Sequence, residues 1–424
     1  FALDTNTGQY LWCRPYHTSI ERSSVEVDED GHLYFTVSEA VISLTAMGEE
    51  RWRADLTNVQ GEAAGGWGVH FTPQGHVATV TSSGRVYLLD RLTGDPLSTL
   101  DIGSQWGFVS PETFGIDLDP SSLLPEEVQA DIRSVWGDPS DAEQSEGFGA
   151  LLGSGKFVDN TVAVSSRGDV YVISGGPSPQ EGAVVQVKVT GSADEPVLGR
   201  GWFAVTDQGS ATTPSISLGD RYLVISDGAH PSTFFNPSDA YGEIKVYDIE
   251  RCDANQDSDL DPERCGVAWS HPLERSPMVG APAISAEGTV IYWEMGLAFD
   301  APPTAADVVA VNETGVLWQT ALPDDMDWSS VVTVTRNHVI GSASRVTPSE
   351  QGLPGFRLPH ETVDRIVVLD RFSGELVWHH DLPDDSAATV TVGPDGSLYV
   401  PMLGIFSILA INERPTLGLM KFIP

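Results

Sequence analysis

The segment Ile366-Val-Val-Leu-Asp370-Arg-Phe-Ser-Gly374-Glu-Leu-Val-Trp378 decides the fold of this chain. It consists of an apolar run, an Asp, two residues, a Ser and a Gly, and a second apolar run that ends on Trp. β-Branched and aromatic residues favour strands. Asp370 can bond the backbone two residues further on, and Gly374 can adopt the positive φ that closes a turn. The segment therefore predicts a β-hairpin with a Trp on its second strand.

The same pattern recurs along the chain, which distinguishes it from an isolated hairpin. Copies occur at 1–12, 42–52, 86–94 and 308–318, and all except 86–94 end on a Trp, namely Trp12, Trp52 and Trp318. A period of about 40 residues is typical of folds that stack equivalent units. Because such a unit cannot bury its apolar face alone, a Trp on its outer strand is suited to packing against the next unit. We therefore predict that these three residues and Trp378 dock neighbouring units.

A Gly turn followed by a Tyr-bearing strand precedes most of these hairpins. Examples are Asp30-Gly31-His-Leu-Tyr34, Arg167-Gly168-Asp-Val-Tyr171, Glu287-Gly288-Thr-Val-Ile-Tyr292 and Asp395-Gly396-Ser-Leu-Tyr399. Asp-Gly between alternating strands is a strong hairpin signal. Together the two elements supply four antiparallel strands in roughly 40 residues, which is the content of one propeller blade. The predicted fold class is therefore all-β, a β-propeller of four-stranded antiparallel blades.

The number of blades depends on how the ends of the chain are interpreted. We predict one propeller domain over 1–424, in which 1–16 is the last hairpin of a partial first blade. Because the segment 407–412 already supplies inner strands near the end of the chain, we favour eight blades, with seven blades closed by strand exchange as the alternative. A long loop insert, 101–149, interrupts the blades, and a short helix is expected at 120–134.

Composition narrows the range of partners. The chain has 23 Lys and Arg against 60 Asp and Glu, a formal net charge of −37, and 41% of its residues are hydrophobic. This apolar content is enough for a large core. Binding to nucleic acid needs a basic face, so we expect none. The charge also disfavours anionic membranes, and no apolar run of about 18 residues predicts a transmembrane segment.

The pattern of apolar residue, Asp-x-x-Thr-Gly and a later Trp resembles the tryptophan-docking repeat of β-propellers of the pyrroloquinoline-quinone (PQQ)-like type. That family includes the quinoprotein alcohol dehydrogenases and the outer-membrane-assembly lipoprotein propeller. The resemblance implies the fold and says little about activity. Quinoprotein dehydrogenases hold their quinone beneath a disulfide between adjacent cysteines. The three cysteines here, Cys13, Cys252 and Cys265, include no adjacent pair, so the chain resembles the lipoprotein propeller more and we do not expect PQQ.

An Asp-rich loop at 252–265 is the sharpest local feature. Oxygen-bearing side chains stand at every second position, and the candidate ligands are Asp253, Asn255, Asp257, Asp259, Asp261 and Glu263. Ca²⁺ takes six to eight hard oxygen ligands, which such a loop can supply. It departs from an EF-hand loop at Ser258, where Gly is usual, and at Arg264, where a Glu closes the site. The alternative is a solvated acidic hairpin tip without a metal.

The cysteines that flank this loop are placed to form a disulfide. Pairing of Cys252 with Cys265 would close a short loop and stabilise the fold by about 3 kcal/mol. A disulfide also indicates an oxidising compartment. Cys13 would be left over, and because it follows Trp12 we expect it to be buried as a small apolar residue.

Aromatic residues in long loops are the candidate partner-binding residues. They are Phe234, Phe235, Tyr241 and Phe356. Loops of this length in a compact domain are usually functional, and exposed aromatic residues are suited to binding a partner. The alternative, which the sequence leaves open, is that these aromatic residues cap the propeller itself.

The function predicted from these features is a non-catalytic extracytoplasmic propeller. It would be secreted or held at a bacterial cell surface, present its loops to protein partners, and be stabilised by Ca²⁺. Attachment would depend on residues upstream of Phe1. A PQQ-dependent dehydrogenase is the first alternative, and a glycan-binding propeller is the second, supported only by the loop aromatics.

Overall fold

The computed structural model describes residues 2–16, 25–110, 157–206, 212–227, 242–254, 263–274, 281–294, 305–326, 328–329, 331–353, 356–386, 389–402 and 418–423. Two compact units are present. Unit 1 comprises 1–114, 146–221 and 247–267, and unit 2 comprises 115–145, 222–246 and 268–424.

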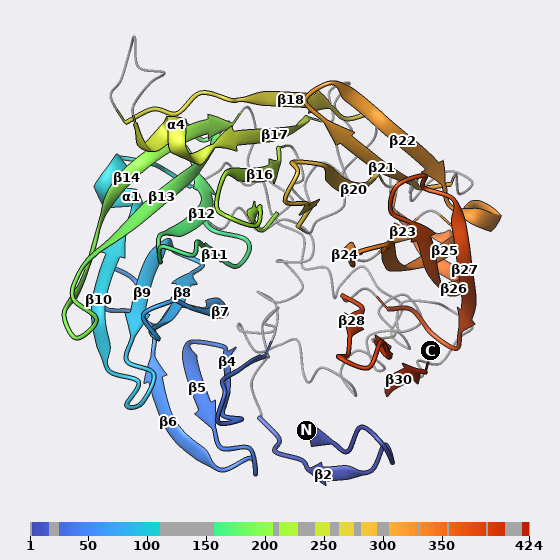
Figure 1. Cartoon of the computed structure of the whole chain (residues 1–424). Helices are drawn as coiled ribbons and strands as arrows, with labels where there is room; N and C mark the ends of the chain where they lie inside the picture. The colour runs from blue at the N-terminus through green and yellow to red at the C-terminus, as the bar shows by residue number, and fades with distance from the viewer. Residues whose placement is uncertain are drawn as a thin grey trace. The chain divides into compact units, whose positions relative to one another are not determined.

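Unit 1 is built from antiparallel sheets whose strands follow one another in chain order (Figure 1). A two-stranded sheet contains β1 (Ala2–Leu3) and β2 (Tyr10–Trp12). The first four-stranded sheet contains β3 (Glu26–Val27), β4 (Leu33–Val37), β5 (Ala40–Leu44) and β6 (Glu50–Asp55). The next contains β7 (Gly66–Phe71), β8 (Val77–Thr81), β9 (Arg85–Leu89) and β10 (Pro96–Asp101). A third contains β11 (Ala163–Val164), β12 (Val170–Gly175), β13 (Gly182–Gly191) and β14 (Pro196–Thr206). Strand β15 (Ser215–Ile216) and the short helices α1 (Ile102–Trp106) and α4 (Ile249–Asp253) complete the unit.

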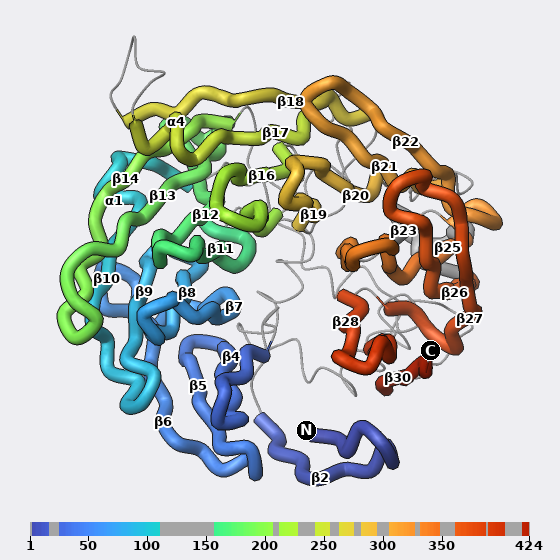
Figure 2. Tube along the Cα trace, in the orientation of Figure 1, coloured from blue at the N-terminus to red at the C-terminus, as the bar shows by residue number. Residues whose placement is uncertain are grey.

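Unit 2 repeats this organisation, as the chain trace in Figure 2 shows. It contains β16 (Tyr222–Ser226), β18 (Trp269–Pro272) and most of β17 (Glu243–Asp248). A four-stranded sheet follows, with β19 (Ala283–Ile284), β20 (Val290–Glu294), β21 (Asp307–Asn312) and β22 (Gly315–Ala321), and then the 3-10 turn η3 (Pro323–Asp325). The five-stranded sheet has β23 (Trp328–Ser329), β24 (Thr333–Val334), β25 (His338–Leu353), β26 (Phe356–Asp370) and β27 (Leu376–Leu382). The last sheet has β28 (Thr391–Val392), β29 (Leu398–Met402) and β30 (Gly418–Phe422).

The core lies between consecutive sheets rather than within one of them. Every residue of β5 and of β8 is buried, so these inner strands are covered on both faces. On the outer strand β6 burial alternates, and Trp52 and Ala54 face inward. One core cluster joins Tyr34, Trp52 and Leu56 of one repeat to Val77 and Tyr87 of the next. Each sheet therefore completes its core only with its neighbour, as the repeat pattern predicts.

The predicted fold class is confirmed: the chain is an all-β propeller with four-stranded antiparallel blades. The blade number is seven, which the sequence analysis kept as the alternative, rather than the favoured eight. Among the described residues seven sheets have three or more strands, and the hairpin β1–β2 stands as a separate two-stranded sheet. The helix predicted at 120–134 and most of the insert 101–149 lie outside the described residues.

Candidate functional site

Three of the four predicted docking indoles lie on the turn of the following repeat. The indole Nε1 of Trp12 donates to the carbonyl oxygen of Ala46 at 2.9 Å, that of Trp52 to Arg91 at 3.0 Å, and that of Trp318 to Arg371 at 3.0 Å. The ring also covers the Gly of that turn: a Cβ on Gly94 would lie 2.6 Å from the Trp52 ring. The Thr-Gly turn and the Trp are therefore two halves of one contact between successive repeats.

Trp378 lies in a different environment from the other three. Its side chain on β27 is 39% exposed, and it stacks on His380 with ring centroids 5.9 Å apart. The edge of its ring meets Phe422 of β30 at 5.6 Å. Trp378 therefore contacts a neighbouring strand within unit 2, whereas each of the other three indoles contacts a Gly turn.

The two ends of the Asp-rich loop are fixed within unit 1. Cys252 and Cys265 are both buried and joined by a disulfide, with their Cα atoms 5.1 Å apart. The backbone N–H of Phe203 on β14 donates to the carbonyl of Glu263 at 2.8 Å, and the N–H of Cys265 donates back to Phe203 at 2.7 Å. The returning end of the loop is thus paired with β14.

The carboxylates at both ends of this loop are already engaged with cationic side chains. Asp253 accepts from Arg167 at 2.7 Å and from the Gln186 amide at 3.0 Å. Glu263 is paired with Arg200. The remaining predicted ligands, Asn255, Asp257, Asp259 and Asp261, lie outside the described residues. Calcium binding by this loop therefore stays a prediction that rests on those four side chains.

Most of the predicted partner-binding aromatic residues fall outside the structure's description. Phe234, Phe235 and Tyr241 are not among the described residues, and Phe356 is described only as part of the backbone of β26. The insert that begins after β10 provides two aromatic residues that are described. Trp106 stacks on Phe108, and Phe108 meets Phe203 of β14 edge to face at 5.4 Å. These two pack against β14 of unit 1, and the role of the four predicted aromatic residues stays a prediction.

The prediction that Cys13 is buried is wrong, because the residue is exposed. It follows Trp12 at the end of β2, and neighbouring residues on a strand point to opposite faces. The indole faces the next repeat, so the thiol faces the solvent.

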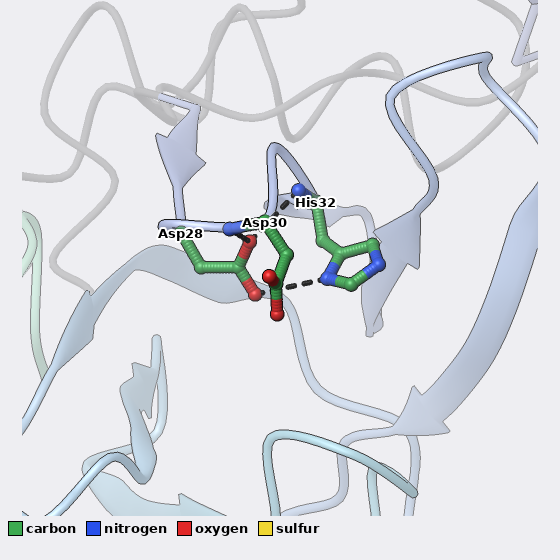
Figure 3. A group of neighbouring side chains, drawn as sticks. All are labelled: Asp28, Asp30 and His32. Carbon is green, nitrogen blue, oxygen red and sulfur yellow. Dashed lines mark hydrogen bonds and ion pairs between the residues drawn. The ribbon is translucent and has the colours of Figure 1, made fainter.

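One group of side chains within the described ranges has the spacing of a metal centre. Ligand atoms of Asp28, Asp30 and His32, in the turn between β3 and β4, lie within 4.8 Å of one another. Figure 3 shows the His32 ring directed at the Asp28 carboxylate, with Nδ1 3.0 Å from Oδ2. Asp30-Gly31-His32 predicts only a hairpin when taken as a turn, but the Asp-x-Asp-x-His spacing of residues 28–32 is also visible in the sequence.

Asp28 is held by many donors from its own turn. Oδ1 accepts the backbone N–H groups of Asp30 and His32 at 3.0 and 2.8 Å, and Oδ2 accepts the Tyr34 hydroxyl at 2.9 Å. Burial acts to raise the pKa of Asp28, but these hydrogen bonds and His32 outweigh it and lower the pKa to about 2. The carboxylate is therefore charged at all physiological pH values and already saturated with donors.

Other repeats make the same turn with a hydroxyl in place of the Asp28 carboxylate. The hydroxyls of Thr72, Ser165 and Ser285 each accept the backbone N–H four residues on, at 3.1, 3.1 and 3.0 Å. Asp28 occupies the equivalent place, with its carboxylate in the role of the hydroxyl. The Asp28 group therefore has an architectural role in its own turn, whatever else it binds.

Glu294, at the end of β20 in unit 2, is a buried acid with a displaced pKa. Its Oε1 accepts the Tyr292 hydroxyl and the backbone N–H of Glu274, both at 3.3 Å. Its Oε2 has no hydrogen-bond partner among the described residues. Burial raises the pKa of Glu294 to about 7. A single shifted carboxyl is compatible with proton transfer but does not define a reaction.

The repeats and the docking contacts together define a β-propeller. BamB from Moraxella catarrhalis is similar, with 14% identity over 90% of this chain and 82% of that chain, and a TM-score of 0.49. The quinohemoprotein alcohol dehydrogenase from Comamonas testosteroni has 11% identity over 94% of this chain and 67% of that chain, and a TM-score of 0.50. The Cps50 (Swd1) β-propeller domain from Myceliophteria thermophila has 9% identity over 93% of this chain and 96% of that chain, and a TM-score of 0.48. At these identities the similarity concerns the fold alone.

No protein-family model matches the chain, and no curated protein matches its sequence. In the described part of the chain, no helix has the length and apolar character needed to cross a membrane.

Proposed function

We propose that this chain is a non-catalytic extracytoplasmic propeller that binds protein partners through its loops. The observation that carries the proposal is that polar side chains in the described turns bind other groups of the same scaffold. Asp253 and Glu263 pair with Arg167 and Arg200, and Asp28 is saturated by its own turn. These groups hold the scaffold together, which leaves the function to the loops between the strands.

Two features support an extracytoplasmic location. The disulfide between Cys252 and Cys265 needs an oxidising compartment to persist. The net charge of −37 keeps such a protein soluble and favours partners with a basic face. Thiol titration of the unfolded, unreduced chain tests the location: one reactive thiol supports it, and three reactive thiols contradict it.

A test for catalysis separates this proposal from the quinone-dependent alternative. The purified protein is supplied with PQQ and Ca²⁺ and assayed for dye-linked oxidation of primary alcohols. We expect no turnover above that of the same mixture with the heat-denatured protein. Turnover that depends on the folded chain would overturn the non-catalytic proposal.

The binding of a basic protein tests whether the propeller is a scaffold for protein partners. We expect the protein to bind a basic model protein at low salt and to lose that binding as the ionic strength rises. The replacement of Phe235 and Tyr241 by Ala should weaken binding of a partner held by the loops, whereas Tyr10→Ala on the exposed hairpin should not. If the Phe235 and Tyr241 replacement and Tyr10→Ala bind the partner equally well, the loop aromatic residues do not bind it.

A further inference from the structure

The outer strand of the sheet β7–β10 lacks the docking indole of the repeat. The Asp-x-x-Thr-Gly turn at 90–94 is followed by Ser98, where the other copies have Trp. The strand register shows that the positions are equivalent. Ser98 pairs with Leu88 across a bulge. Trp52 pairs with Ser43 across a bulge at the same place in its own hairpin. Ser98 therefore stands where an indole would reach the next repeat, and its side chain is too short to do so.

The next sheet has a longer hairpin at this junction. Beyond their bulge, β9 and β10 form one register pair, Leu89 with Pro96. Beyond the corresponding bulge, β13 and β14 continue through five pairs, from Val187 to Gly191 on β13. In Figure 1 this hairpin, drawn in green, extends beside β10. The extension, residues 188–199, is called the strap below.

The strap returns to the sheet whose outer strand lacks the indole. The backbone N–H of Leu198 donates to Ser98 Oγ at 3.1 Å. The Leu198 side chain is buried in one core cluster with Leu88 and Leu100 of that sheet. An indole such as that of Trp52 donates from the earlier sheet to a carbonyl of the later one. Here the later sheet supplies both the donor and the apolar side chain, so the same two components of a docking contact are provided in the opposite direction.

A buried histidine holds the tip of the strap. His76, in the turn between β7 and β8, is 4% exposed, and its Nε2 lies 2.7 Å from the carbonyl oxygen of Ala193. Because a carbonyl can only accept, Nε2 carries the hydrogen of the neutral ring. Nδ1 then accepts from the hydroxyl of Thr72, which is 3.3 Å away. His76 therefore joins its own turn to the strap through one defined tautomer.

We propose that the strap takes the place of the missing indole and fastens the outer part of the sheet β11–β14 to the sheet β7–β10, with His76 as its latch. Two separate contacts hold it, one at Ser98 and one at Ala193. The register pairs of the strap lie beyond the bulge, so the strap can open while both sheets keep their strands. It is thus a conformational device of unit 1, and it does not depend on the proposed function.

Hydrogen exchange of the backbone amides of the full chain tests the strap. Ser98→Ala removes the acceptor of the Leu198 N–H, and His76→Phe removes the donor to Ala193. We expect each variant to speed exchange within 188–199 by about tenfold, as for the loss of one hydrogen bond, while the amides of β8 keep their wild-type rates. His76→Gln keeps a donor and should exchange more slowly than His76→Phe. Thr99→Ala, which removes the neighbouring exposed hydroxyl, is the control and should leave the strap unchanged.

An exchange of parts provides a second test, in which one substitution changes the sign of its effect. Ser98→Trp should lower the melting temperature of the wild type, because the indole collides with Leu198. In a chain whose residues 188–199 are replaced by the six-residue turn 90–95, Ser98→Trp should raise it, because the indole then meets a Gly turn, as that of Trp52 does. The hydrogen-exchange result stands whether or not the grafted chain folds. The proposal is overturned if Ser98→Ala and His76→Phe both leave exchange in the strap unchanged, or if Ser98→Trp lowers the melting temperature of both chains equally.

Discussion

The indole N–H of Trp52 donates to the carbonyl oxygen of Arg91 at 3.0 Å, and the face of the same ring covers Gly94. One side chain thus supplies a hydrogen bond, apolar burial and a steric constraint to the next repeat. Trp12 and Trp318 make the equivalent contacts at Ala46 and Arg371. The contact between repeats is therefore specified by two residues, an indole and a glycine, which are 36, 42 and 56 residues apart for Trp12, Trp52 and Trp318.

Removal of the Trp52 indole should be among the most damaging single changes. Trp52 is buried, so Trp52→Ala leaves a cavity and an unpaired carbonyl, and we expect a loss of about 3–5 kcal/mol in the free energy of unfolding. Trp378→Ala is the matched control, because Trp378 is 39% exposed and contacts no Gly turn in the described part of the chain. It should cost on the order of 1–2 kcal/mol. Equal losses in urea denaturation would contradict the docking role of Trp52.

The glycine half of the contact can be tested on its own. Gly94 has φ of +80°, and a Cβ there would lie 2.6 Å from the Trp52 ring. Gly75 has φ of +88° in a similar turn, but a Cβ there meets nothing within 4 Å. Gly75→Ala should therefore cost only the backbone strain, about 1–2 kcal/mol. Gly94→Ala should cost clearly more by thermal melting, and an equal cost would show that the ring can shift without penalty.

The burial of Glu294 predicts a pH dependence with a definite sign. Its pKa is about 7 in the folded chain against 4.5 for the free side chain, so the folded state binds more protons between these values. The contribution of Glu294 to the free energy of unfolding is therefore present below pH 4.5 and is lost as the pH rises to 7. Glu294→Gln should flatten this part of the stability curve and stabilise the chain at pH 8 by about 1–3 kcal/mol.

The control for this prediction is Glu375→Gln, which changes an exposed acid in the turn before β27. It should leave the pH dependence unchanged. If the free energy of unfolding of Glu294→Gln falls between pH 5 and pH 7 as steeply as that of the wild type, other groups cause this pH dependence.

The repeat made the fold predictable, because the features that specify it are local. Asp370 accepts the N–H groups of Phe372 and Ser373 at 2.9 and 2.8 Å, as an Asp at that turn position should. The Trp that ends the pattern docks on the next turn at Trp12, Trp52 and Trp318, whereas Trp378 stacks on His380 instead. The fold and three of the four docking residues could thus be predicted from spacing alone, whereas the blade number depended on how the chain ends pair, which no local pattern encodes.

The candidate sites were far less predictable, for a physical reason. Glu294 and Glu274 are 20 residues apart, and the backbone N–H of Glu274 reaches Oε1 of Glu294 only in the folded sheet. The burial of Glu294, rather than any spacing in the sequence, displaces its pKa. The Asp-rich loop showed the opposite case: its spacing was visible, but the ion pairs of Asp253 and Glu263 with Arg167 and Arg200 depend on strands far away in the sequence.

Loss of the disulfide should destabilise unit 1 without altering its strand content. Cys252 and Cys265 are 13 residues apart, and opening so short a loop costs about 3 kcal/mol in the loop-entropy model. The double replacement of both residues by Ser should lower the free energy of unfolding by that order, measured in urea without reductant, and the wild type with reductant should match it. Cys13→Ser is the control, since that thiol is exposed, and it should change little. If the double variant were as stable as the wild type, the pairing of Glu263 and Cys265 with Phe203 would be sufficient to hold the loop by itself.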